Sequence, residues 1–412
     1  MTTQLSTCAV RSSFGEWAFE AGQNGLHPMI YVVGTRGKST VARLLDTIAR
    51  ESGLRTALRT DSGVEIEGKR QMGDIHPLVE ALECLDSGEL DLAIIEMDWS
   101  DLHTLPVGDR QPGAVIVSTI CPHKEYCLLE DTKRAIAGLK ALLLSTPEST
   151  MIAADIDDAA FPSLNDVNFE NMILTTVSET HPSLRRFLAQ GGLAAWTSDH
   201  DLVVGSRDSV NLRMPIDEIP VTLDGAVLFQ MRNVMLASSV AAAIGIPAES
   251  VRAGLLRVQP DHANLPTSLN SFVTDGGIRV LIDRPSPSWF LGPLLRAARG
   301  MKPKRTIYVV DYRDMPNHDD SVEVGRMIGR NASMCVMIND EKSLASVMAV
   351  KAGMAQNDVP PPIAHVETLP KAIQRALSAA REDDLIVVLT NQVQTVYRSM
   401  ARHRVADSSP AK

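Results

Sequence analysis

The chain has 412 residues, of which 44% are hydrophobic and 22% are charged, and its formal net charge is -10 at pH 7. Single cores stop growing at about 250–300 residues, so this length indicates two domains. The composition is that of a globular enzyme rather than of a disordered or fibrous chain. The acidic balance argues against nucleic acid as the main partner, because phosphate backbones attract basic surfaces.

Cysteine use and hydropathy favour a cytoplasmic protein. The five cysteines are scattered and form no CxxC pair, which suggests neither a disulfide framework nor a zinc ribbon. The segment Cys121–Cys127 offers three metal ligands, whereas a structural zinc normally takes four. No apolar run reaches the roughly 18 residues that a membrane helix needs, so we expect no transmembrane segment.

Short apolar runs alternate with amphipathic stretches from Met29 onward, a pattern that predicts parallel strands joined by helices. The expected strands of the first domain are Met29–Val33, Leu92–Glu96, Ala114–Ser118 and Met151–Ala154, with helices at Ser39–Ser52 and Lys133–Leu144. The mostly helical segment Leu223–Val258 is expected to complete it. We therefore predict an α/β fold with a doubly wound, mostly parallel sheet.

A second, smaller α/β pattern begins near Ile278. Its expected strands are Val280–Asp283, Thr306–Asp311, Met334–Ile338 and Leu385–Leu389, and its expected helices are Ser288–Arg299, Val322–Arg330, Glu341–Ala355 and Leu369–Ala380. Prolines and turn formers in Pro260–Pro266 mark the linker. We expect an N-terminal extension at 1–28, a nucleotide-binding domain at 29–265, a Rossmann-like domain at 266–405 and a disordered tail at 406–412.

The segment Gly34-Thr35-Arg36-Gly37-Lys38-Ser39-Thr40 follows an apolar strand and precedes a helix. A glycine-rich turn in this setting points backbone N–H groups and the positive end of the helix dipole at one spot, which suits phosphate. Lys38 is expected to reach the β- and γ-phosphates of ATP, and the Ser39 hydroxyl to bind Mg²⁺. Gly34 and Gly37 leave room where a Cβ would obstruct the turn or the phosphate. The alternative is a chance Gly-Lys-Ser at an ordinary helix start.

The spacing of this loop is unusual, because only two residues separate Gly34 from Gly37. A standard Walker A loop has four between its first glycine and the Gly-Lys pair. The shortened loop resembles that of the Mur ligase superfamily, whose members use ATP to activate a carboxylate as an acyl phosphate and then couple it to an amine. The resemblance covers Met29 to Tyr397, weakly after Gly276, and implies ATP, Mg²⁺ and small carboxylate and amine substrates such as amino acids or peptides.

Further motifs follow in the order of that superfamily. Ala93–Glu96 looks like its second strand, whose terminal glutamate holds magnesium, and a carboxylate in such a position lies beside the nucleotide crevice. The alternative for Glu96 is a solvated strand end. His123 matches a histidine that approaches a second metal ion, although Pro122 stands where relatives have an aspartate. The resemblance thus implies three catalytic residues, Lys38, Glu96 and His123, and three metal ligands, Ser39, Glu96 and His123.

Other positions resemble the surroundings of the nucleotide. Asp155-Ile156-Asp157-Asp158 is similar to the family's Asn-x-Asp-Asp turn. Asn233 matches an asparagine near the adenine, and Arg232 replaces the histidine that precedes it. Asp283 resembles an aspartate that contacts the ribose, and Arg313 falls where relatives carry an arginine-containing loop. The alternatives are a buried polar helix start for Asn233, a helix cap for Asp283 and a solvated charge for Arg313.

Within the superfamily the closest resemblance is to the catalytic ligase subunit of poly-γ-glutamate capsule synthesis. Like that subunit, the chain lacks the domain that binds the uridine nucleotide in peptidoglycan ligases, and Arg55–Gly63 is similar to its strand and threonine-glycine turn. It departs from the subunit in having no hydrophobic anchor. We interpret Lys133 and Lys140 as exposed helical lysines rather than as the carbamylated lysine of some relatives.

Three functions follow from these motifs. The leading hypothesis is an ATP-dependent carboxylate–amine ligase that extends a γ-glutamyl or related amino-acid chain. Its rival, favoured by Pro122, is a catalytically degenerate nucleotide-binding subunit that supports a partner protein. A kinase or switch NTPase shares only the loop. A membrane partner and an oligomeric state are left open.

Overall fold

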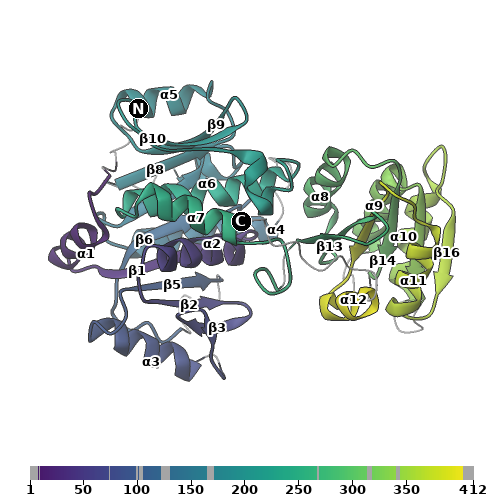
Figure 1. The fold of residues 1–412 in the computed structure, drawn as a ribbon, viewed down its shortest axis with the longest axis horizontal. Coiled ribbons are helices and arrows are strands. Elements are labelled where there is room, and N and C mark those ends of the chain that lie inside the picture. The colour runs from purple at the N-terminus through teal and green to yellow at the C-terminus, as the bar shows by residue number, and fades with distance from the viewer. Residues whose placement is uncertain are drawn as a thin grey trace. The chain divides into compact units, whose positions relative to one another are not determined.

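The structure is a computed structural model that describes residues 8, 10–73, 75–98, 101, 105–121, 130–164, 171–266, 269–312, 318–339 and 344–401. The chain divides into two compact units, Met1–Val258 and Gln259–Lys412. Each unit has its own β-sheet with helices packed on it (Figure 1).

The first unit is built on a sheet whose eleven described strands lie in the order β11-β10-β9-β8-β7-β6-β1-β5-β2-β3-β4. The strands are β1 (His27–Val33), β2 (Thr56–Thr60), β3 (Gly63–Ile66), β4 (Lys69–Arg70), β5 (Leu92–Met97), β6 (Pro112–Val117), β7 (Met151–Asp155), β8 (Asn171–Thr176), β9 (Ala194–Ser198), β10 (Asp201–Gly205) and β11 (Val210–Pro215). The stretch from β9 to β2 in this order is parallel, and both edges are antiparallel. The predicted doubly wound, mostly parallel sheet is confirmed.

Helices cover both faces of this sheet. They are α1 (Phe14–Gln23), α2 (Lys38–Glu51), α3 (Ile75–Asp86), α4 (Glu130–Ser145), α5 (Pro182–Ala189), α6 (Leu228–Ala243) and α7 (Ala248–Arg257). Helices α3, α4 and α5 share one core with alternate residues of the strands, such as Met29 and Val33 of β1, while α2, α6 and α7 pack together (Figure 1). Because β1, β5, β6 and β7 are buried along nearly their whole length, they read as continuous apolar runs.

The connections of β1 and β6 leave the sheet in opposite directions. Strand β1 leads through α2 to β2 on one side, and its neighbour β6 leads through α4 to β7 on the other side. The carboxyl ends of two such strands border a crevice, which is where open α/β sheets bind ligands. The loop that contains the Gly-Lys-Ser motif lies at this point.

The second unit contains a smaller sheet in the order β12-β13-β17-β14-β15-β16, parallel except for β12. Its strands are β12 (Asn270–Val273), β13 (Arg279–Asp283), β14 (Thr306–Val310), β15 (Met334–Ile338), β16 (Ile363–Val366) and β17 (Leu385–Leu389). Its helices are α8 (Ser288–Gly300), α9 (His318–Asn331), α10 (Leu344–Ala355), α11 (Leu369–Ala379) and α12 (Val393–Met400). The predicted second α/β sheet is thus present.

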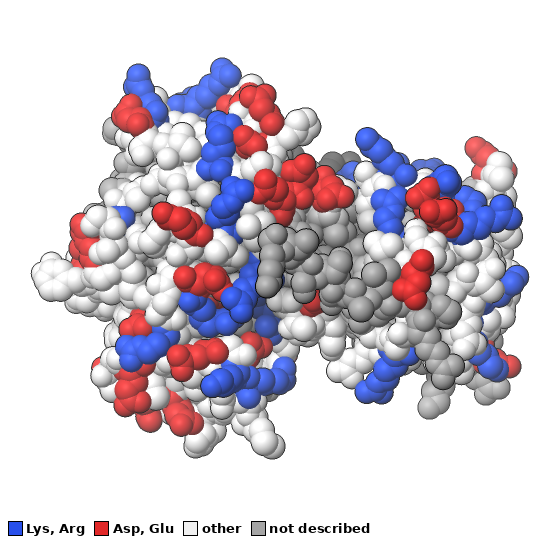
Figure 2. Space-filling model, in the orientation of Figure 1, with Lys and Arg blue, Asp and Glu red and all other residues white. Residues whose placement is uncertain are grey.

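Three further observations concern the whole chain. Among the described residues, no helix combines the length and the apolar character that a membrane crossing requires. Cys84 and Cys335 are free thiols, whereas Cys121 is disulfide-bonded, which the cysteine spacing did not predict. On the face shown in Figure 2, basic and acidic side chains are intermixed.

Candidate nucleotide-phosphate site

The loop between β1 and α2 has the backbone of a phosphate-binding turn. Gly34 and Gly37 have φ angles of 142° and 93°, in the left-handed region that side chains rarely adopt. A Cβ on Gly34 would lie 2.2 Å from the Ser118 Oγ, and a Cβ on Gly37 would lie 2.4 Å from the Asn233 Oδ1. Both positions therefore need glycine. Gly37 begins α2 without a capping side chain, and uncapped N–H groups at a helix start favour an anion.

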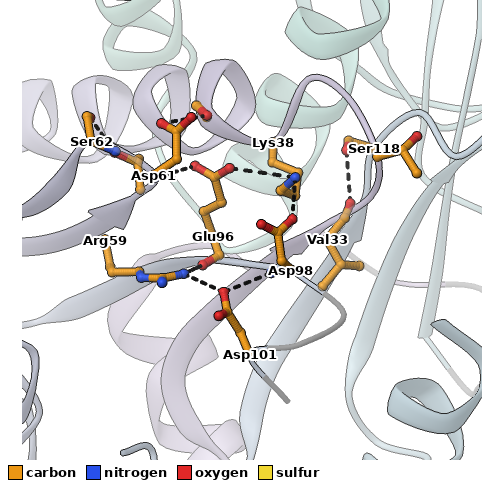
Figure 3. Close-up of polar contacts among 12 residues, drawn as sticks. Val33, Lys38, Arg59, Asp61, Ser62, Glu96, Asp98, Asp101 and Ser118 are labelled. Atoms are coloured by element: carbon orange, nitrogen blue, oxygen red, sulfur yellow. Dashed lines mark hydrogen bonds and ion pairs between the residues drawn. The ribbon is translucent and has the colours of Figure 1, made fainter. Parts of the chain in front are cut away.

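The segment that follows strand β6 holds this loop in place. The Thr35 backbone N–H and Oγ1 both donate to the Thr119 carbonyl oxygen, at 2.9 and 2.8 Å. The Arg36 N–H donates to the same oxygen at 3.1 Å. One residue earlier, the Ser118 Oγ donates to the Val33 carbonyl oxygen at 2.9 Å (Figure 3). The shape of the loop is therefore set by the neighbouring strand at the crevice.

Lys38 extends from the first turn of α2 toward the carboxyl end of β5. Its Nζ lies 2.8 Å from the Asp98 Oδ1 and 3.8 Å from the Glu96 Oε1 (Figure 3). The Lys38 and Glu96 side chains are 10% and 4% exposed, whereas Asp98 is 60% exposed. A largely buried ammonium at the start of a helix is well placed to bind phosphate oxygens.

Glu96 lies in an oxygen-rich cluster. Its Oε2 accepts a hydrogen bond from the Asp61 backbone N–H at 3.1 Å, and the Ser39 hydroxyl donates to the Asp61 Oδ1 at 3.4 Å. Burial raises the pKa of Glu96, and the Lys38 ammonium opposes this shift. Hydroxyl and carboxylate oxygens are the ligands that Mg²⁺ prefers, so these side chains fit the ion.

This cluster is not an all-protein metal site. Within the described ranges, no group of three His, Cys, Asp or Glu side chains has a metal-binding arrangement. Mg²⁺ usually keeps several water ligands and takes others from a substrate phosphate, so one or two protein oxygens are sufficient.

Arg59, from β2, organises the end of β5. Its guanidinium donates to the Glu96 backbone carbonyl oxygen and, at 2.7 Å, to the Asp101 Oδ2. The same Asp101 oxygen accepts a hydrogen bond from the Asp98 backbone N–H at 2.9 Å. Figure 3 shows these contacts directly beside the Lys38 ammonium. They fix the backbone between the two carboxylates that face Lys38.

The first turns of α6 also contact the loop. The Asn233 Oδ1 packs on Gly37, and the Asn233 Nδ2 donates to the Gln230 Oε1 at 2.8 Å. The Arg36 guanidinium lies over the Phe229 ring, 5.8 Å from its centroid. Asn233, predicted from sequence, is therefore brought to the phosphate loop, and it is buried there together with Gln230.

The turn after β7 supports the segment that follows β6. Asp158 accepts hydrogen bonds from the backbone N–H groups of Ile120 and Cys121 at 2.8 and 3.2 Å. Asp155, at the end of β7, forms an ion pair with Arg232 of α6, with 3.3 Å between the Asp155 Oδ2 and the Arg232 Nε. Burial raises the pKa of Asp155 to about 7, opposed by the charge of Arg232.

Other positions named from the sequence are described by the elements that contain them. Asp283 is buried at the end of β13 in the second unit, and its backbone carbonyl oxygen accepts a hydrogen bond from the Thr390 N–H at 3.0 Å. Thr40 is buried within α2. Lys133 and Lys140 belong to α4.

Three predicted positions cannot be placed. His123, the neighbouring Pro122 and Arg313 lie outside the described residues. The roles that the sequence resemblance implies for His123 and Arg313 stay predictions.

The sequence analysis did not predict Asp61, Asp98 or Arg59 as site residues. Asp61 and Asp98 lie just beyond the carboxyl ends of β2 and β5, strands that lie side by side next to β1. A carboxylate at the end of a parallel strand was the signal that identified Glu96. The same signal, applied one or two residues further along, would have included both aspartates.

Comparisons with known proteins bear on the family. No protein-family model matches the chain. The chain is 22% identical over 413 residues to cyanophycin synthetase of Trichormus variabilis, a match that covers 95% of this chain and 45% of the relative. The chain thus spans less than half the length of the curated cyanophycin synthetases that it matches over most of its own length.

Solved structures agree in fold. The pseudomurein peptide ligase type C from Methanothermus fervidus matches with a TM-score of 0.61 and 13% identity, over 91% of this chain and 78% of that one. FolC of E. coli in complex with DHPP and ADP matches with a TM-score of 0.59 and 14% identity, over 97% and 94%. The chain has the fold of the Mur ligases and FolC. A particular closeness to the poly-γ-glutamate ligase subunit is not shown.

Proposed function

We propose that the chain is an ATP-dependent ligase that joins a carboxylate to an amine through an acyl phosphate. The observation that carries the proposal is the position of the buried Lys38 ammonium between the two-glycine loop and Glu96. The relatives support it, since they are named as a synthetase and as ligases, and one structure of FolC contains ADP.

The loop residues 34–37 and the N-terminus of α2 would bind the β- and γ-phosphates of ATP. Lys38 would exchange its ion pair with Asp98 for phosphate oxygens and stabilise charge on the transferring phosphoryl group. Ser39 and Glu96 would hold Mg²⁺, which supplies further positive charge there.

The reaction has two steps. A carboxylate oxygen of the first substrate attacks the γ-phosphorus, the bond to the leaving ADP oxygen breaks, and an acyl phosphate forms. The amine of the second substrate then attacks the carbonyl carbon, phosphate leaves, and the nitrogen loses a proton to give the amide. In this scheme the protein's task is mainly to position the reactants and to balance charge.

Further roles rest on the family resemblance. Asn233 would lie near the adenine, Asp283 would contact the ribose, and Arg313 would belong to a nucleotide-facing loop. His123 would approach a second metal ion. The substrates would be amino acids or peptides, with a growing γ-glutamyl or related amino-acid chain as the specific proposal.

Product analysis tests the function. The purified chain is incubated with ATP, Mg²⁺ and pairs of amino acids or short peptides, and ADP, phosphate and the new amide are measured together. A ligase forms one amide for each ATP consumed, and Lys38→Ala should form the amide at least about 10²-fold more slowly. Nucleotide breakdown without an amide for any pair would reject the ligase proposal.

A silent nucleotide-binding subunit is the second candidate, because Pro122 lacks the oxygen ligand that the resemblance places beside His123. The substitution Pro122→Asp restores a carboxylate at that position. We expect measurable turnover in the parent and tighter binding of a second Mn²⁺ in the variant. Tight ATP binding, no turnover with any substrate pair and no gain in Pro122→Asp would favour the silent subunit.

A further inference from the structure

Two departures from the family's sequence pattern contact each other in the folded chain. Asp155 stands at the first position of the turn that resembles Asn-x-Asp-Asp, and Arg232 stands where the resemblance expects a histidine. They are 77 residues apart (232 minus 155) in sequence, yet the Arg232 Nε and the Asp155 Oδ2 lie 3.3 Å apart. The side chains are 18% and 3% exposed, so this ion pair is largely withdrawn from water.

The pair has few other polar partners. Neither the Asp155 Oδ2 nor the Arg232 Nε has a hydrogen bond within the described part of the chain, although both atoms are buried. The other oxygen, Asp155 Oδ1, accepts a hydrogen bond from the Asp157 backbone N–H at 2.9 Å. Removing one member of a buried ion pair leaves the other charge uncompensated, which is strongly destabilising. The two residues therefore depend on each other.

Arg232 is also next to the residue that contacts the phosphate loop. Asn233 packs its Oδ1 on Gly37, and Phe229, one turn earlier in α6, lies under Arg36. Asp155 ends β7, which neighbours β6, and the segment just after β6 holds the loop through Thr119. The ion pair thus joins the helix and the part of the sheet that together contact the loop.

We propose that Asp155 and Arg232 are a mutually dependent pair of positioning residues that holds the first turns of α6 against the phosphate loop and so sets nucleotide affinity. This inference rests on the proposed nucleotide-binding function of the same loop. The pair acts through Asn233 and Phe229 rather than by touching the nucleotide. Two neutral hydrogen-bonding side chains, one at each position, should hold α6 equally well. One charged and one neutral side chain should not.

A double-mutant cycle tests this pairing. Asp155→Asn, Arg232→His and the double variant are compared with the parent by calorimetric titration of ADP at pH 8, where an ordinary histidine is neutral. Each single variant should bind ADP roughly tenfold more weakly, and the double variant within about threefold of the parent, as expected for directly coupled neighbours. Two results would overturn the proposal: single variants that bind ADP as tightly as the parent, or a double variant whose loss of ADP affinity is the full sum of the two single losses.

The matched control is the ion pair Asp46–Arg50 inside α2. Its Arg50 Nε and Asp46 Oδ2 are 2.9 Å apart, and the Asp46 and Arg50 side chains are 3% and 34% exposed, so it resembles the first pair in chemistry and in the burial of its carboxylate. Asp46→Asn should lower the melting temperature but leave ADP affinity unchanged. If it weakens ADP binding as much as Asp155→Asn does, the effect is general destabilisation and the positioning role is wrong.

Hydrogen exchange separates this inference from the proposed function. Peptides covering residues 34–37 and the start of α6 should exchange faster in both single variants and return to the parent rate in the double variant, with no nucleotide present. If the parent does not bind ADP, the proposed function is wrong. The hydrogen-exchange rates alone then test whether Asp155 and Arg232 position α6. Unchanged exchange in the single variants would refute it.

Discussion

At the scale of single residues, the site depends on one buried cation among carboxylates. Lys38 is surrounded by Glu96, Asp98 and, through Glu96, the backbone of Asp61. These acidic groups compensate the ammonium in the protein, and a polyphosphate bound at the loop would add its own negative charge. The balance suits a bound metal–nucleotide complex, in which Mg²⁺ offsets the carboxylates.

The first prediction concerns Lys38. Lys38→Ala should reduce ATP turnover by about 10²-fold or more, because it removes the main charge directed at the transferring phosphoryl group. The fold should persist, as checked by circular dichroism. The control is Lys371→Ala in α11, which removes an exposed ion pair with Glu367 and should leave turnover unchanged. Equal turnover in Lys38→Ala and the parent would exclude the loop as the phosphate site.

The second prediction concerns Glu96. Glu96→Gln keeps the shape of the side chain but removes a metal-ligating charge, so the Mg²⁺ concentration for half-maximal turnover should rise about tenfold or more, an estimate for losing one carboxylate ligand. The control is Asp91→Asn. Asp91 lies just before the amino end of the same strand and forms an ion pair with the exposed Arg55. A Mg²⁺ titration that coincides with that of the parent would show that Glu96 is not a ligand.

The third prediction concerns pH. Burial raises the pKa of Asp155 from its ordinary 3.8 to about 7, so the folded chain holds this proton more tightly than the unfolded chain does. The stability gained from the protonated carboxyl is complete below about pH 4 and is lost as the pH rises through about 7. Asp155→Asn cannot ionise. The unfolding free energy of this variant, relative to that of the parent, should therefore rise between pH 5 and pH 8 in urea titrations. A difference that does not change with pH would contradict the raised pKa of Asp155.

At the scale of elements, close helix packing in the second unit depends on two glycines. A Cβ on Gly325 of α9 would lie 1.9 Å from the Val350 carbonyl oxygen, and one on Gly353 of α10 would lie 1.8 Å from the Val322 carbonyl oxygen. The backbones of these helices therefore touch directly. A methyl group at either position must push them apart.

The fourth prediction follows from this contact. Gly353→Ala should destabilise the second unit by about 1–3 kcal/mol, as overpacking of a tight core does. The control is Gly22→Ala in α1, where an added Cβ would have no atom within 4 Å. That variant should be neutral or slightly stabilising, since alanine favours a helix interior over glycine. Equal melting temperatures for the two variants would show that α9 and α10 can adjust.

At the scale of the whole molecule, each unit has its own sheet and core. The fifth prediction is that calorimetry resolves two unfolding transitions, and that Gly353→Ala lowers only the one that belongs to the second unit. ADP with Mg²⁺ should raise the other transition, by about 2.7 kcal/mol of added stability at a hundredfold excess over Kd. The shift should vanish in Lys38→Ala. An ADP effect that survives this substitution would place the phosphate site elsewhere.

The sequence alone was sufficient for the fold class and for the two-glycine turn between β1 and α2. Both depend on local signals: continuous apolar runs for strands buried on two faces, helical spacing between them, and glycines at two turn positions. Strands β15 and β17 agree with the predicted bounds residue for residue. Strands β9, β10 and β11, at one end of the sheet, were not predicted, because short strands have a weaker pattern and their pairing depends on the rest of the sheet.

The site beyond the loop was decided by tertiary structure. Strand β5 follows β2 in the chain but lies between β1 and β2 in the sheet, and this order brings Asp98 and Asp61 to Lys38 and Ser39. The contact between Asp155 and Arg232 likewise requires α6 to pack beside the end of β7. Periodicity and motif spacing report which residues share an element. They carry no information on strand order or on which distant charges meet, because those follow from packing the whole sheet.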